Sequence, residues 1–378
     1  MSEPARTSLE EYFGEMPDPR VVGRCDHKLL DIILIAICAV LSGAETWDEV
    51  EEFGEVKEGW LKQFLELPKG VPSHDTFRRV FSVLDAQVFQ DRFLTWVEQT
   101  FRVKREQVIA VDGKSVRRSH HRSANQDCLH LVGAWATANG ITLGQRRVEA
   151  GENEIVAIPE LLRHLYLKGC IVTIDAIGCQ KEIAQHIVDQ HADYVLALKA
   201  NQGRLHQDVV EWFAWAQQQD FRQVEHTYHQ TFTKGHGRIE IRRCWALSDP
   251  QALEVLGHHE GWPHLTRLVM VQRERRRGDT LQTETAYFIS SLPPDAERLL
   301  AAVRSHWQIE NNLHWVLDVI FHEDDSRLRV GNGAENFAVL RRLVLNLLQL
   351  HPAKMSLKRQ RYKAALDDSF LLELLTHV

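Results

Sequence analysis

The feature that most constrains the fold is an alternation of strand-like and helical runs between residues 108 and 219. The run "VIAVDG" (108–113) is typical of a buried strand, and Asn139–Gly140 lies between two further β-rich runs. Asn-Gly is typical of tight hairpin turns, so these two runs are expected to pair antiparallel. Amphipathic helices and buried strands then alternate. The pattern predicts the order β-β-β-α-β-α-β-α and an α/β fold.

The N-terminal region (1–103) is predicted to be a separate helical domain. Its most apolar run, "LLDIILIAICAVLSGA" (29–44), contains Asp31 and is short for a membrane span, so a buried central helix is expected. No secretory signal is apparent at the N-terminus, and no membrane association is expected. The chain has six cysteines and no C-x-x-C pair, which indicates reduced thiols in a cytoplasmic protein.

A second helix is predicted within "PSHDTFRRVFSVLD" (72–85), beginning after Ser73. Its apolar residues share one face, and Arg78 and Arg79 point away from that face. Two interpretations remain open. The segment is either part of a helix-turn-helix DNA reader or a helix of a plain bundle with a solvated arginine pair.

The second half of the chain breaks the alternation. Residues 220–292 are expected to form a β-strand insertion, and a long helix is expected to begin near Asp295. The last residues, 351–378, are predicted to be a basic tail that includes Lys358, Arg359, Arg361 and Lys363. The insertion would divide the core into a first part (104–219) and a second part (293–350).

Two carboxylates stand at matching places in this pattern. Asp112 ends the first predicted strand and Asp175 ends the fourth. If these strands are neighbours, the two acids lie side by side and repel each other unless cations separate them. A pair of Mg²⁺ ions would remove the repulsion and create a phosphoryl-transfer site. The alternative for either residue alone is a cap of a turn or helix.

A third acid, Glu310, is expected from the long helix. His306, Glu310 and His314 are four residues apart and share one helix face, so a zinc site is a rival interpretation. The nearby Asp318, Glu323, Asp324 and Asp325 are expected to be a solvated acidic loop. The Gly-Lys-Ser after Asp112 lacks the second glycine of a nucleotide-binding P-loop.

Several long motifs carry a family resemblance. They include "AVDGKSVRRS", "NEIVAIPELL", "IVTIDAIGCQKEIA", "DYVLALKANQG", "KGHGRIEIR" and "RSHWQIENNLHWVLDV". With "LLDIILIAICAVLSGAETWDEVEEFG" they resemble the H-repeat-associated transposases of bacterial insertion sequences, over about residues 12 to 375. These are DDE transposases with an RNase H-like core. The resemblance implies an RNase H-like mixed sheet flanked by helices, with a β-rich insertion and an all-α N-terminal domain.

The same resemblance implies a function. Asp112, Asp175 and Glu310 match the catalytic acids that hold Mg²⁺, for which Mn²⁺ would substitute. The enzyme would cut double-stranded DNA at the terminal inverted repeats of an insertion sequence and join the freed end to target DNA. A homodimer is expected in the synaptic complex. The alternatives are a structure-selective nuclease on the same fold and a domesticated, catalytically silent DNA-binding protein.

The net charge of the chain is −7, so any DNA binding must depend on local clusters of positive charge. Basic residues in such clusters, together with His306 and Trp307, are therefore expected to contact DNA. Many related enzymes carry a tyrosine, an arginine and a lysine around the glutamate, where this chain has Val303, His306 and Leu317. The residues predicted to contact DNA are Arg78, Arg79, Lys114, Arg117, Arg118, Arg122, Arg275, Arg276, Arg277, His306 and Trp307.

Overall fold

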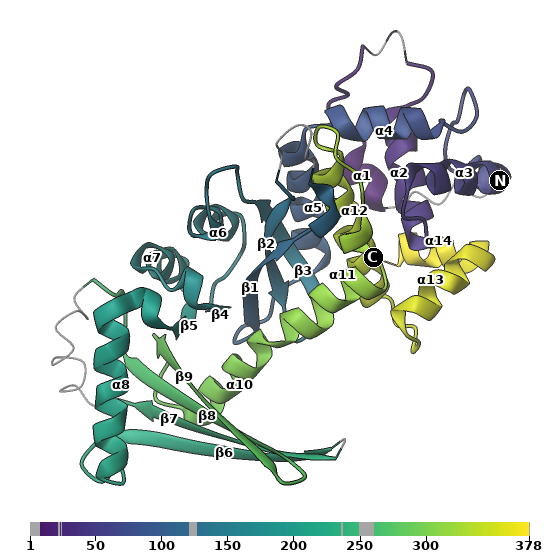
Figure 1. The fold of residues 1–378 in the computed structure, drawn as a ribbon. Helices are drawn as coiled ribbons and strands as arrows, with labels where there is room; N and C mark the ends of the chain where they lie inside the picture. The colour runs from purple at the N-terminus through teal and green to yellow at the C-terminus, as the bar shows by residue number, and fades with distance from the viewer. Residues whose placement is uncertain are drawn as a thin grey trace.

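The protein is built on one nine-stranded mixed sheet with the strand order β3-β2-β1-β4-β5-β9-β8-β7-β6 (Figure 1). This arrangement is seen in a computed structural model, which describes residues 8–21, 23, 25–120, 127–235, 237–248 and 261–377. The first five strands are β1 (Val108–Ser115), β2 (His130–Ala136), β3 (Ile141–Arg147), β4 (Ile171–Ile174) and β5 (Asp193–Leu198). The other four are β6 (His226–Gly235), β7 (Arg238–Leu247), β8 (Arg267–Arg277) and β9 (Thr280–Ser290).

The half of the sheet formed by β1–β5 has the predicted connections. β1 pairs antiparallel with β2 and parallel with β4, and Gly140 has a φ of +72° in the turn between β2 and β3. Helices α6 (Glu154–Arg163), α7 (Lys181–Asp189) and α8 (Gly203–Gln218) follow β3, β4 and β5 in turn. The order β-β-β-α-β-α-β-α and the α/β class are therefore confirmed.

Strands β6–β9 extend the same sheet. β9 pairs antiparallel with β5, with Val195 opposite Ser290, and β8, β7 and β6 follow as an antiparallel meander. Helix α10 (Ala296–His306) packs against both halves of the sheet, on β1 and β4 as well as β6 and β7 (Figure 1). Its buried residues, such as Leu299 and Val303, share an apolar core with Val269 and Phe288. The chain beyond α10 is thereby held close to the end of β1.

The N-terminal helices form a bundle that the C-terminal helices complete. The N-terminal helices are α1 (Ser8–Phe13), α2 (Leu29–Leu41), α3 (Trp47–Leu61), α4 (His74–Val83) and α5 (Ala86–Thr100). Helix α2 is buried along almost its whole length, as its apolar sequence predicts. Helix α12 (Gly333–Leu350) packs on α2, α4 and α5 and also on β3, so it joins the bundle to the sheet. Among the described residues, no helix combines the length and apolarity needed to cross a bilayer.

The expected basic tail is instead part of this bundle. It forms α13 (Leu357–Leu366) and α14 (Asp368–Thr376), which pack against α2, α12 and α1. Arg361 is buried, donates hydrogen bonds to the carbonyl oxygen of Val40 at 3.0 and 3.2 Å, and lies over the Phe321 ring. Arg361 therefore stabilises the bundle and is not available to DNA, because its donors are satisfied inside the protein.

Candidate active site

Asp112 lies on β1, the central strand of the part of the sheet formed by β1–β5, where it faces Gly133 of β2 in the antiparallel register. Its side chain is 16% exposed. Burial raises the pKa of the Asp112 carboxyl to about 7, and the nearby charges of Asp175, Glu310 and Glu154 act in the same direction. A carboxylate in such surroundings is poised to accept a cation.

Asp175 lies beside Asp112 because β4 runs parallel to β1. Val111 is paired with Ile174, and each of these two residues is followed by an aspartate, Asp112 on β1 and Asp175 directly after β4. Asp175 also caps a short turn, since its Oδ1 accepts a hydrogen bond from the N–H of Ile177 at 3.1 Å. Burial raises the pKa of this carboxyl too. The sequence left open whether Asp175 caps a turn or lies beside Asp112, and in the structure it does both.

Glu310 approaches Asp112 from a π-helical segment, Ile309–His314, which continues into α11 (Trp315–Val319). The long helix predicted from Asp295 is therefore interrupted after His306, and π-helical turns are frequent at functional sites. Potential ligand atoms of Asp112, Glu310 and His314 all lie within 4.8 Å of one another. In the part of the chain that the structure describes, Asp175 lies outside this three-residue group.

The donor set of this group suits a divalent cation. It offers two carboxylates and one imidazole, and burial lowers the pKa of His314 to about 4, which leaves a neutral ring with a free lone pair. Carboxylates suit Mg²⁺ and Mn²⁺, and imidazole suits Mn²⁺ better than Mg²⁺. The rival zinc set of His306, Glu310 and His314 is not assembled among the described residues, because His306 does not belong to this group of candidate ligands. Nδ1 of His306 lies instead 3.2 Å from Oγ1 of Thr173 on β4.

Lys114 has different surroundings from those that the sequence suggested. Its side chain is 7% exposed, and its Nζ lies 2.6 Å from Asp318, 3.3 Å from Asp324 and 3.8 Å from Glu323. This placement corrects the expectation that Lys114 faces DNA. It also corrects the expectation of a solvated acidic loop, because Glu323 is fully buried and pairs with Arg342 at 2.8 Å.

The other predicted basic residues differ in their surroundings. Arg117 and Arg118 are exposed but pair with Asp324 and Asp325, each at 3.1 Å. Arg78 and Arg79 are exposed on α4, as predicted, and Arg78 pairs with Asp75. Arg122 lies outside the described residues.

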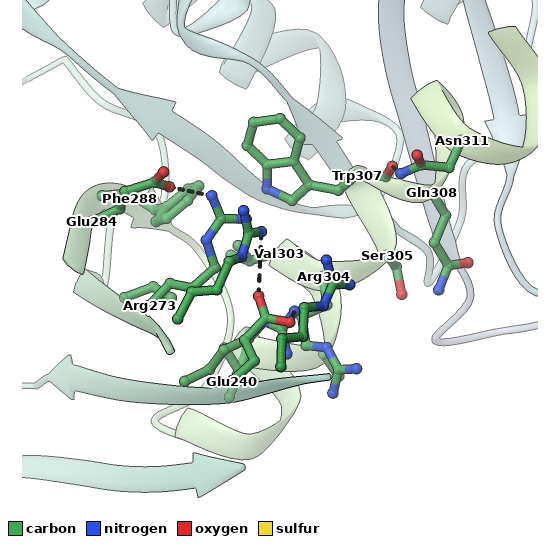
Figure 2. A pocket seen from close by; sticks show the side chains of 17 residues that line it. Glu240, Arg273, Glu284, Phe288, Val303, Arg304, Ser305, Trp307, Gln308 and Asn311 are labelled. Atoms are coloured by element: carbon green, nitrogen blue, oxygen red, sulfur yellow. Dashed lines mark hydrogen bonds and ion pairs between the residues drawn. The ribbon is translucent and has the colours of Figure 1, made fainter. Parts of the chain in front are cut away.

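A cavity of about 730 Å³ adjoins the site between α10 and strands β7, β8 and β9 (Figure 2). Among the described residues, five arginines and two glutamates line it, and these residues carry net positive charge. The arginines are Arg238, Arg242, Arg273, Arg275 and Arg304. Trp307, which is 57% exposed, Gln308 and Asn311 also line the cavity, and they flank Glu310 in sequence. The cavity is therefore continuous with the helix that carries the third acid.

Two of the remaining predicted residues, Arg276 and Arg277, are exposed near the tip of the β8–β9 hairpin, beyond Arg275. His306 is half-buried, and burial lowers its pKa to about 4, so it is neutral near pH 7. The predicted contact of His306 with DNA would therefore be made by a neutral ring.

Models of known protein families match two parts of this chain. The model "Transposase DDE domain" matches residues 104–347, and the model "DDE_Tnp_1-associated" matches residues 10–97. The chain belongs to the DDE transposase family. The boundary between the two matches falls between α5 and β1, where the helical bundle gives way to the sheet.

Curated members of the family match this transposase chain along nearly its whole length. The H repeat-associated putative transposase YhhI of Escherichia coli K12 is 38% identical over 97% of both chains. The putative transposase YncI of Escherichia coli O157:H7 is 39% identical over 97% of this chain and 94% of its own. A chain of a solved piggyBac transposase synaptic complex with hairpin DNA aligns with 98% of this chain and 78% of its own length, with 10% identity and a TM-score of 0.42.

Two residues near the acids of this DDE transposase were missed by the sequence reasoning. The sequence indicates His314 only as a ligand of the rival zinc site, and it does not indicate Glu154 of α6 as a site residue. A Cβ atom on Gly113 would lie 2.1 Å from Oε1 of Glu154, so glycine is required for the carboxylate to approach β1. Nε2 of His130 lies 2.8 Å from Glu154 and fixes this carboxylate. The available signal was the cap residue Asn153, which places Glu154 at the first position of a helix.

Proposed function

We propose that this chain is an active DNA transposase that cuts the ends of an insertion sequence and transfers the cut strand into target DNA. The observation that carries the proposal is the convergence of Asp112, Glu310 and His314, with Asp175 next to Asp112 on the neighbouring parallel strand. These elements come from segments up to 202 residues apart in the sequence, between Asp112 and His314. Membership of the transposase family supports the same reaction class.

The proposed catalytic residues are Asp112, Asp175 and Glu310. When bound, Mg²⁺ or Mn²⁺ ions would activate a water molecule or a DNA 3′-hydroxyl and stabilise charge on the phosphate. Asp112, Asp175 and Glu310 would hold the ions, and His314 would add an imidazole beside Glu310. No side chain needs to form a covalent bond with DNA.

The proposed path of DNA passes the arginine-lined cavity between α10 and β7–β9. Arg275 lies in that cavity, and the exposed Arg276 and Arg277 would extend the contact along the hairpin. Guanidinium groups bind phosphates through paired hydrogen bonds, and an exposed tryptophan such as Trp307 offers a surface on which a base can stack. Arg117 and Arg118 would reach DNA only by exchanging their aspartate partners for phosphates.

The helical bundle is proposed to recognise the terminal inverted repeats through α4, where Arg78 and Arg79 are exposed. Synapsis of two ends implies at least a homodimer, and the reduced, uncrosslinked cysteines fit a cytoplasmic protein.

A plasmid carrying the gene with its own flanking DNA tests this function. Purified protein with Mg²⁺ or Mn²⁺ is expected to cut at the element's ends and to join a precut end bearing a 3′-hydroxyl to a second plasmid. Cutting without joining would indicate a structure-selective nuclease. Binding of the flanking DNA with neither reaction would indicate a silent DNA-binding protein and would overturn the proposal.

A further inference from the structure

Lys114 is the centre of a cluster of ion pairs that joins three parts of the protein. It lies on β1 two residues after Asp112, and both side chains project from the same face of the strand because residues i and i+2 share a face. Its ammonium group contacts Asp318 of α11 at 2.6 Å and Asp324 of the following turn at 3.3 Å. Lys114 therefore connects the strand that carries Asp112 to the helix that follows Glu310.

The partners of Lys114 are themselves fixed in the core. Glu323, 3.8 Å from Nζ of Lys114, is fully buried and bonds to Arg342 of α12 at 2.8 Å. Helix α12 packs on α2 and β3, so the acidic turn is anchored to the bundle and to the sheet. The ion pairs of Lys114 thus fix α11 against β1.

The helix that carries Glu310 needs such an anchor. Glu310 is exposed and lies in a π-helical segment, whose hydrogen bonds are less regular than those of an α-helix. Asp318 lies eight residues later in sequence, in the helix that continues this segment. Fixing Asp318 to β1 therefore limits how the π-helical segment can rotate or slide relative to Asp112.

We propose that Lys114 is a positioning residue that sets the separation between Asp112 and Glu310 through its ion pair with Asp318. The inference rests on the proposed function, because it assigns these two acids to one metal site. It replaces the role in phosphate binding that the sequence suggested for Lys114. Loss of the ion pair would leave Asp112, Glu310 and His314 unchanged as residues but would let Glu310 and His314 move relative to Asp112.

The test measures Mn²⁺ binding to the full chain by calorimetry and electron paramagnetic resonance, without DNA. Lys114→Met is expected to weaken binding by about tenfold or more, the effect typical of losing a supporting interaction around a metal site. Asp318→Asn, which keeps the shape of the side chain, is expected to weaken binding similarly. The double variant is expected to lose little more than either single variant, because both remove the same interaction.

Lys57 offers a matched control. Its Nζ pairs with Asp368 at 2.6 Å, the same separation as in the Lys114–Asp318 pair, but it joins α3 to α14 inside the bundle. Lys57→Met is expected to leave Mn²⁺ affinity unchanged. Thermal melts in EDTA verify that each variant is folded, and Asp318→Asn provides the answer if Lys114→Met does not fold.

The competing role as a phosphate contact predicts a different result. Removing one phosphate contact lowers the salt dependence of duplex DNA binding by about one ion. Normal Mn²⁺ affinity in folded Lys114→Met or Asp318→Asn protein, with a reduced salt dependence for Lys114→Met, would overturn the inference alone. A wild-type protein that binds no Mn²⁺ would overturn both the inference and the proposed function.

Discussion

Nδ1 of His314 lies 3.7 Å from Oδ2 of Asp112, so a neutral imidazole from a π-helical segment faces a carboxyl group on β1. Both side chains are largely shielded from solvent, at 14% and 16% exposure. A nitrogen donor beside two carboxylates distinguishes this site from one built of oxygen ligands alone.

We expect His314→Ala to change the metal preference of the protein. Removing the imidazole is expected to weaken Mn²⁺ binding by about tenfold and Mg²⁺ binding much less, because Mg²⁺ favours oxygen ligands. Titration of each ion by calorimetry measures the ratio. An equal loss of affinity for both ions would show that His314 supports the fold of the site and contributes no selectivity.

Asp112→Asn is expected to stabilise the metal-free protein at pH 8. The folded-state pKa of about 7 lies above the unfolded value of about 3.9. The stabilisation of the protonated form is therefore complete below pH 4 and is lost as the pH rises through 7. The variant removes this loss, which is on the order of 4 kcal/mol at most.

Denaturant unfolding in EDTA at pH 4.5 and pH 8 checks the effect of Asp112→Asn. The stability gain over the wild type is expected at pH 8 and is expected to shrink toward zero at pH 4.5. A stability gain of equal size at both pH values would contradict the raised pKa of Asp112, because such a gain could not arise from ionisation of this residue.

Gly113→Ala is expected to disturb the site although it adds one methyl group. The new Cβ would lie 2.1 Å from Oε1 of Glu154, so β1 or α6 must shift. Displacements of about 1 Å near reacting groups cost about 100-fold in rate. The double variant Gly113→Ala/Glu154→Ala is expected to recover the stability lost in the single variant, because the clash is gone. Unchanged stability in the single variant would show that α6 yields freely.

Trp307→Ala is expected to weaken DNA binding by about 1–3 kcal/mol if a base stacks on the indole ring. Arg304→Ala, in the same cavity, is expected to lower the salt dependence of binding by about one ion. Arg359, exposed on α13, provides the control, and Arg359→Ala is expected to change neither quantity. Fluorescence anisotropy with flanking DNA that carries a single-stranded end, at several salt concentrations, measures both effects. Equal effects for all three variants would contradict a DNA path through the cavity.

Much of this architecture could be predicted from local sequence patterns. The hairpin at Asn139–Gly140, the strand-helix alternation and the buried helix α2 depend on residues that are near one another in the chain. The proximity of Asp112 and Asp175 could be predicted as well, because parallel strands bring equivalent ends to one edge of a sheet.

The partners of the basic residues could not be predicted in this way. Lys114 resembles a surface cation in the sequence, yet its partners Asp318 and Asp324 follow 204 and 210 residues later. Arg361 reaches Val40 across 321 residues. Whether a cation binds DNA or a buried carbonyl depends on tertiary contacts, and local composition does not encode them. The π-helical segment that aims Glu310 and His314 at Asp112 likewise depends on packing against β1.

Metal-dependent cleavage of the flanking DNA by four proteins tests the central claim most directly. The wild type is compared with Asp112→Asn, Asp175→Asn and Glu310→Gln, each with Mg²⁺ and with Mn²⁺, and binding of the same DNA is measured in parallel. We predict that each single substitution abolishes cleavage with both ions while DNA binding stays nearly unchanged. Wild-type rates of cleavage by the Glu310→Gln protein, or by either aspartate variant, would contradict the account.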